Sequence, residues 1–130
     1  MSQTECQAFW NSRYQATDYA YGKTPNAFFR TQLDKLPAGK ILLPADGEGR
    51  NGVYAATRGW DVTAFDLSRE GRRKAEALAA ECGVSLRYLV GTLDEMDFQA
   101  ASFDALALVF AHFAAEQKTA LYRELLRLLK

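Results

Sequence analysis

Residues 45–52 form a glycine-rich loop between a short apolar run and a helical pattern. The preceding residues 40–44, Lys-Ile-Leu-Leu-Pro, are typical of a buried strand. Within the loop, Gly47, Gly49 and Gly52 make a G-x-G-x-x-G pattern. Glycine permits backbone angles that a Cβ forbids, and it lets a ligand approach the main chain. Unpaired N–H groups at the start of the next helix attract anionic groups. The pattern therefore predicts a ligand-binding strand–turn–helix unit, with a simple tight turn as the alternative.

Strands and helices alternate along the rest of the chain. Further strands are expected at residues 61–65, 84–90 and 103–110, and the last of these is nearly all apolar, as in a strand covered on both faces. Strands that alternate with helices imply right-handed crossovers and a parallel sheet. The sequence thus predicts an α/β fold with a doubly wound parallel sheet of four strands, in which ligands bind beyond the carboxyl ends of the strands.

The helix ends carry recognisable signals. Thr24 is expected to cap a helix that runs to Leu36, with Pro25 at its first position. Ser68 is expected to cap a longer helix that runs to Cys82. Four leucines of the final helix have the spacing of a core-facing stripe, which indicates packing against the sheet. They are Leu121, Leu125, Leu128 and Leu129.

Asp66 ends the second strand, about 20 residues after the glycines. At this position an acidic side chain can accept hydrogen bonds from both hydroxyls of a ribose. The alternative is a capping role for the helix that starts near Ser68. Together with the loop, Asp66 predicts a ligand that contains adenosine.

Longer segments resemble class I S-adenosylmethionine-dependent methyltransferases, and most closely the tellurite-resistance and thiopurine methyltransferase-like group. Residues 41–51 read ILLPADGEGRN and residues 59–68 read GWDVTAFDLS. Members of the group often read GEGRN and then G-x-x-V-T-A-x-D-x-S. Residues 9–14, FWNSRY, and 21–26, YGKTPN, are similar to the group's N-terminal segment. The resemblance covers nearly the whole chain.

The resemblance implies one Rossmann-like domain. Residues 1–38 would form N-terminal lid helices, and residues 39–130 would form the cofactor-binding core. In the group the final helix is followed by a fifth strand and an antiparallel hairpin, so we expect these C-terminal strands to be missing. The fourth strand would then have an open edge, and a homodimer through that strand or the final helix would cover it.

The resemblance also implies S-adenosyl-L-methionine as cofactor and assigns its binding residues. Gly47 and Gly49 would pass under the methionine part, Asp66 would hold the ribose, and Leu67 would pack on the adenine. Segments after the third and fourth strands, together with the N-terminal lid, would complete the site. The full implied set is Arg13, Tyr14, Ala45, Asp46, Gly47, Gly49, Asn51, Asp66, Leu67, Thr92, Leu93 and Phe110.

The implied reaction is methyl transfer to a small molecule such as a thiol or a tellurite- or selenite-like anion. Such a transfer mainly needs alignment and exclusion of water. His112, the single histidine, would suit an acceptor that must lose a proton, or it would be a loop residue without that role. A non-catalytic cofactor-binding or assembly module is the alternative. An NAD(P)-binding domain is a further one, although Glu48 in the loop would sit poorly against a pyrophosphate.

The overall charge argues against nucleic-acid and membrane partners. Sixteen basic residues balance sixteen acidic ones, so no global field attracts a polyanion or an anionic membrane. The chain has no signal-peptide pattern at its start and no apolar run long enough to span a bilayer. Cys6 and Cys82 form no metal or redox motif, which favours a cytoplasmic location and no metal site. The charged run of residues 69–74 is interpreted as a solvated helix face.

Overall fold

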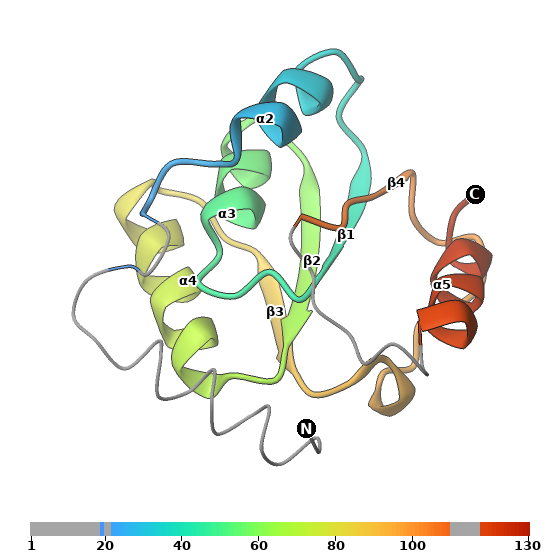
Figure 1. Ribbon diagram of the computed structural model, residues 1–130. Helices are drawn as coiled ribbons and strands as arrows, with labels where there is room; N and C mark the ends of the chain where they lie inside the picture. The colour runs from blue at the N-terminus through green and yellow to red at the C-terminus, as the bar shows by residue number, and fades with distance from the viewer. Residues whose placement is uncertain (1–18, 20–21, 110–117) are drawn as a thin grey trace.

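The computed structural model describes residues 19, 22–109 and 118–130 (Figure 1). Within this part of the chain, four strands form one sheet in the order β3-β2-β1-β4. All three strand pairs are parallel. This confirms the α/β fold with a parallel sheet. The strands are β1 (Lys40–Pro44), β2 (Asp61–Asp66), β3 (Arg87–Val90) and β4 (Ala105–Leu106).

Helices cover both faces of this sheet. In Figure 1, α2, α3 and α4 lie on one side, whereas α5 lies on the other side, next to β4. Helices on both faces are what parallel strands joined by helical crossovers require. The helices are α2 (Ala27–Leu33), α3 (Arg50–Thr57), α4 (Arg69–Glu81) and α5 (Lys118–Arg127), with a short 3₁₀ helix η1 (Leu93–Glu95) after β3.

Strand β1 lies in the middle of the sheet and contributes to both hydrophobic cores. Its residues Ile41 and Leu43 pack with residues of α2, α3 and β2 in one cluster. Leu42 points to the opposite face and packs with Leu125 and Leu128. All five side chains are at most 1% exposed. Alternate residues of one strand thus face two cores, which explains why β1 reads as a continuous apolar run.

Two helix starts can be compared with the sequence. Ser68 caps α4 as predicted, because its Oγ accepts a hydrogen bond from the Gly71 N–H at 3.0 Å. The predicted cap at Thr24 is wrong, since α2 is capped by Asn26, whose Oδ1 accepts from the Phe29 N–H at 3.0 Å. The helix also ends at Leu33, earlier than expected.

The last two strands are shorter than predicted. Strand β3 begins at Arg87, not at residue 84. Strand β4 pairs with β1 only at Ala105 and Leu106, so the prediction of a strand over 103–110 that is buried on both faces is wrong. Before the strand begins, Phe103 forms a bridge with Leu129, and the Asp104 carboxylate accepts the Lys40 N–H at 2.9 Å, so pairing with β1 starts only at Ala105. Residue 110 lies outside the described part.

No helix among the described residues is both long enough and apolar enough to cross a membrane.

Candidate functional site

The segments that follow β1, β2 and β3 meet at the carboxyl edge of the sheet. The Asp46 N–H donates to the Phe65 carbonyl oxygen at 3.4 Å, and the Gly91 N–H donates to the Asp66 carbonyl oxygen at 2.9 Å. The Gly47 N–H donates to Oδ2 of Asp66 at 2.9 Å. The structure therefore brings the glycine loop, the end of β2 and the segment after β3 into one place, with Asp66 between the other two.

The glycine loop has an alternating left-handed backbone. The φ angle is +54° at Ala45, +60° at Gly47 and +88° at Gly49. Side chains rarely adopt such angles, which accounts for two of the three residues being glycine. At Gly49 space is limiting as well, because a Cβ there would lie 2.4 Å from the Cβ of Ala75 in α4. The loop is thus shaped by its own glycines and by close contact with α4.

Asp66 is buried and anchors the loop. Its Oδ2 accepts from Gly47, and its Oδ1 accepts from the Ser68 N–H at 3.3 Å. Burial raises the pKa of this carboxyl, and the backbone N–H groups around it oppose that rise. The capping role near Ser68 is taken by Ser68 itself, not by Asp66. The Leu67 N–H bonds the same carboxyl, and because a carboxylate offers about four acceptor sites, these three bonds leave capacity for a ligand hydroxyl.

Asp46 and Asn51 hold neighbouring parts of the chain. The N-cap residue of α3 is Gly49, which has no side chain to cap the helix, and Oδ2 of Asp46 accepts from the Gly52 N–H at 3.2 Å instead. Burial is the main cause that raises the pKa of the Asp46 carboxyl to about 8, with a smaller contribution from the nearby Asp66 and against the opposing effects of Gly52 and Arg50. Oδ1 of Asn51 accepts from the N–H of the α2 cap residue at 2.8 Å.

The other predicted residues in the described part lie around Asp66. Leu67 directly follows it and is half-buried. The N–H and Oγ1 of Thr92 both donate to Oε1 of Glu95 at 2.9 Å, which closes the turn that leads into η1. Leu93 is 6% exposed and packs in the core with Phe65. Arg13, Tyr14, Phe110 and His112 lie outside the described residues.

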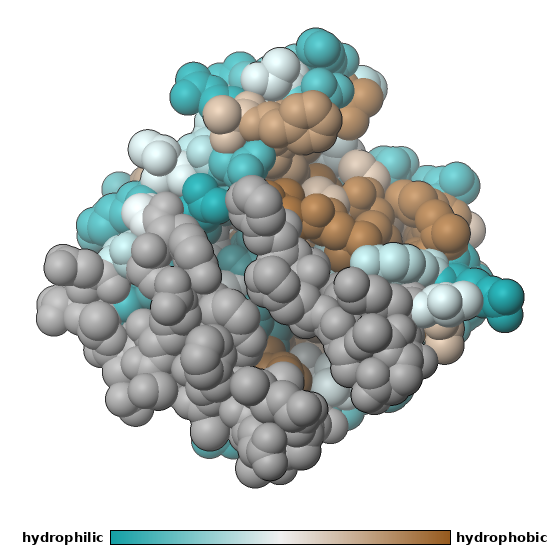
Figure 2. Space-filling model, in the orientation of Figure 1, coloured by the Kyte–Doolittle hydropathy of each residue, from teal (hydrophilic) through white to brown (hydrophobic). Residues whose placement is uncertain are grey.

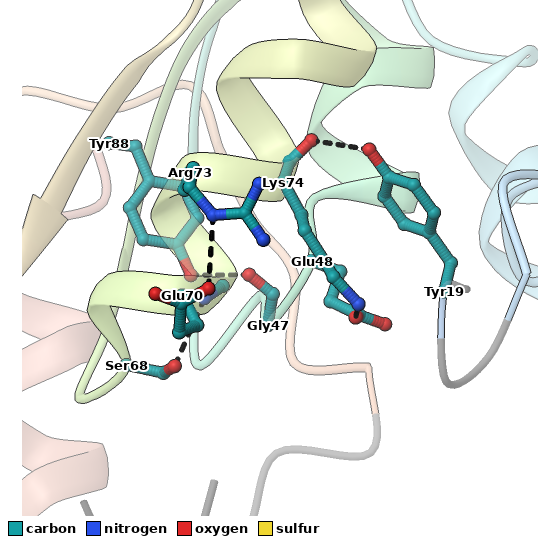
Figure 3. Close-up of polar contacts among 9 residues, drawn as sticks. Tyr19, Gly47, Glu48, Ser68, Glu70, Arg73, Lys74 and Tyr88 are labelled. Atoms are coloured by element: carbon teal, nitrogen blue, oxygen red, sulfur yellow. Dashed lines mark hydrogen bonds and ion pairs between the residues drawn. The ribbon is translucent and has the colours of Figure 1, made fainter. Parts of the chain in front are cut away.

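Sequence reasoning missed two side chains that hold the loop. Lys74 was interpreted as part of a solvated face, which is wrong for this residue: its Nζ lies 2.7 Å from Oε2 of Glu48, and both side chains are almost fully buried (Figure 3). The Tyr88 hydroxyl, from β3, donates to the Gly47 carbonyl oxygen. The spacing of Gly71, Lys74 and Leu78 along α4 was the available signal, because it places Lys74 on the buried face.

Comparison with known proteins decides the family. Residues 41–130 match the model of a methyltransferase domain. The chain belongs to this methyltransferase domain family. Among curated relatives it is 29% identical over 92 residues to YbaJ of Bacillus subtilis, named an uncharacterized methyltransferase, a match that covers 70% of this chain and 36% of that protein.

Solved structures share the fold of this chain. An S-adenosylmethionine-dependent methyltransferase from Thiobacillus denitrificans, in complex with S-adenosyl-L-homocysteine, aligns with a TM-score of 0.68 and 21% identity, over 94% of this chain and 51% of that one. A second structure comes from work on the conversion of a disulfide bond into a thioacetal group during echinomycin biosynthesis. It aligns with a TM-score of 0.79 and 19% identity, over 95% of this chain and 56% of that one. At these identities the likeness is one of fold. The methyltransferase domain described here thus spans about a third of YbaJ and about half of these two structures.

Proposed function

We propose that this methyltransferase domain binds S-adenosyl-L-methionine at the glycine loop and transfers its methyl group to a small-molecule acceptor. The observation that carries the proposal is the bond between the Gly47 N–H and Asp66, because it fixes the loop beside the acidic residue at the end of β2. In this arrangement the methionine part of the cofactor lies along the loop, where Gly47 and Gly49 carry no Cβ. Asp66 accepts hydrogen bonds from the ribose hydroxyls.

The carboxyl groups around the loop favour this cofactor over NAD(P). The carboxyls of Asp46, Glu48 and Asp66 lie in or beside the loop, and Lys74 is paired with one of them. The N–H groups of Gly47 and Gly52, which a pyrophosphate at this loop would use, already donate to Asp66 and Asp46. Glu48 itself is turned toward α4, so the argument against a pyrophosphate depends on Asp46 and Asp66.

The reaction we propose needs little from the protein beyond alignment. The lone pair of the acceptor forms a bond to the methyl carbon while the bond from that carbon to sulfur breaks, which leaves S-adenosyl-L-homocysteine. The domain aligns the two partners and excludes water. The resemblance of the loop and of residues 59–68 to the tellurite-resistance and thiopurine methyltransferase-like group leads us to propose a thiol or a selenite- or tellurite-like anion as acceptor.

His112 is proposed as the general base for acceptors that carry a proton. The test measures S-adenosyl-L-homocysteine release with a panel of thiols, selenite and tellurite. The His112→Ala variant should slow turnover of thiols that are protonated at the assay pH and leave anionic acceptors unaffected. Equal effects on both classes would remove His112 from proton transfer. Cofactor binding without turnover of any acceptor would favour the non-catalytic module.

We also propose that two copies associate through β4 and α5. Strand β4 pairs on one side with β1, and its other edge is open among the described residues. Leu108 is 40% exposed and Leu126 is 63% exposed. Apolar residues gather over β1 and β4 in Figure 2. Contiguous exposed apolar surface commonly marks an interface, and a two-fold contact would bury it on both copies.

A further inference from the structure

One face of α4 lies directly against the glycine loop. A Cβ on Gly71 would lie 2.7 Å from the Gly47 carbonyl oxygen, and a Cβ on Gly49 would lie 2.9 Å from the Cα of Ala75. Lys74 lies between these two contacts on the same helical face and reaches Glu48. Three consecutive loop residues are therefore each in contact with one residue of α4.

The contact in the middle is a buried ion pair. Nζ of Lys74 lies 2.7 Å from Oε2 of Glu48, and the two side chains are 3% and 4% exposed (Figure 3). Two charges out of water need close, well-directed contact to offset the loss of hydration. Glu48 therefore has a defined direction, toward α4. Since Glu48 stands between Gly47 and Gly49, this direction keeps its side chain off the other side of the loop.

Two tyrosines contact Lys74 and the loop residue before Glu48. The Tyr19 hydroxyl donates to the Lys74 carbonyl oxygen at 2.7 Å, and Nζ of Lys74 lies 5.3 Å from the centre of the Tyr19 ring. The Tyr88 hydroxyl donates to the Gly47 carbonyl oxygen. Lys74, in α4, thus contacts the glycine loop through Glu48 and the N-terminal part of the described chain through Tyr19.

We propose that Lys74 is a positioning residue for the cofactor: by holding Glu48 against α4, it keeps the Gly47–Gly49 backbone in the shape that binds S-adenosyl-L-methionine. This rests on the proposed function and assigns a role to a residue outside the predicted site. An ion pair that served folding alone could be replaced by neutral side chains of similar size without loss of folding stability, because such replacements are often neutral or stabilising. Cofactor affinity would then be unchanged. Measuring cofactor affinity and folding stability on the same variant therefore distinguishes a positioning role from a role in folding alone.

The test uses calorimetric titration with S-adenosyl-L-homocysteine, together with thermal unfolding of the same samples. Lys74→Met alone leaves a buried carboxylate unpaired, so the decisive variant is the double replacement Glu48→Gln with Lys74→Met. Lys74→Arg is the conservative variant, because it keeps a positive charge opposite Glu48. Arg73→Met is the matched control, since Arg73 is the neighbouring residue on α4 and pairs with Glu70 on an exposed face.

We expect the double variant to unfold near the wild-type temperature and to bind the cofactor product about tenfold more weakly or worse, as a misplaced loop would. Lys74→Arg should recover most of the affinity, and Arg73→Met should stay within about twofold of wild type. A stable double variant with wild-type affinity would overturn the proposal. If the double variant does not fold, the replacement of both residues by methionine, Glu48→Met with Lys74→Met, decides in the same way, because it leaves no buried charge. Failure of the wild-type chain to bind would instead refute the proposed function.

Discussion

Gly71→Ala is the substitution for which the structure reverses the usual expectation. Gly71 lies in the first turn of α4, and in a helix alanine is normally favoured over glycine by about 1 kcal/mol. Here the added Cβ would lie 2.7 Å from the Gly47 carbonyl oxygen and 3.2 Å from the Tyr88 hydroxyl. The carbonyl cannot retreat freely, because the Tyr88 hydroxyl donates to it.

Relief of this overlap requires a shift of the loop or of α4, and overpacking of this kind costs about 1–3 kcal/mol. Set against the helix preference, the net result is a destabilisation of up to about 2 kcal/mol, or up to about 8 °C in the unfolding temperature, where an ordinary helix position would gain stability. Cofactor affinity should fall as well, because the loop moves. The control is Gly83→Ala, where φ is +70° and a Cβ would meet open space.

Thermal unfolding and titration with S-adenosyl-L-homocysteine measure both effects. The control should lose about 1 kcal/mol through its left-handed backbone and keep its affinity. A Gly71→Ala protein that is more stable than wild type and binds equally well would refute the described contact between α4 and the loop.

Three further substitutions test neighbouring features. Asp66→Ala should weaken cofactor binding by about 1.5–3 kcal/mol in a titration, through loss of hydrogen bonds to a charged group, and unchanged affinity would remove Asp66 from the site. Gly49→Ala should destabilise the domain by about 1–3 kcal/mol more than Gly59→Ala in urea unfolding. Both glycines have a positive φ, but a Cβ at Gly59 would meet its nearest atom, the Ala38 Cβ, at an ordinary 3.8 Å. Equal losses of stability would contradict the contact between Gly49 and α4. Leu126→Glu should abolish association in sedimentation equilibrium at micromolar concentration, and a wild-type monomer would refute the proposed dimer.

Asp46 predicts a pH dependence of stability. Its pKa is raised from 3.8 to about 8 in the folded chain, so the folded state holds a proton that the unfolded state releases between these values. By linkage, stability falls as the pH rises through this window, by up to a few kcal/mol in total. Asp46→Asn keeps an acceptor for the Gly52 N–H and should flatten the decline between pH 5 and 9 in urea unfolding. The same slope in both proteins would show that Asp46 ionises normally.

Features set by neighbouring residues could be predicted from the sequence. Strand β1 occupies the predicted residues, and Ser68 caps α4. The approach of the glycine loop to the end of β2 follows from the parallel sheet alone, because carboxyl ends of such strands share one edge. The prediction for Asp66 depended on this rule, and the structure places its carboxylate against the Gly47 N–H.

Features set by contacts between distant residues could not be predicted in the same way. Lys74 lies within a charged run, and its burial depends on a loop residue 26 positions earlier in the chain. The apolar composition of residues 103–110 indicated a long strand, but pairing with β1 begins only at Ala105, after Phe103 has paired with Leu129 and the Asp104 carboxylate has accepted the Lys40 N–H. Asn26 caps α2 in place of Thr24, and its own N–H is held by Asn51 of α3. In each case the partner, rather than the local pattern, decides the outcome.

Calorimetric titration of the wild-type domain with S-adenosyl-L-homocysteine and with NAD tests the central claim most directly. The account predicts saturable binding of S-adenosyl-L-homocysteine at one site per chain and no measurable heat with NAD, because Asp66 and Asp46 already accept from the Gly47 and Gly52 N–H groups that a pyrophosphate at the loop would use. Binding of NAD, or of neither compound, would contradict it.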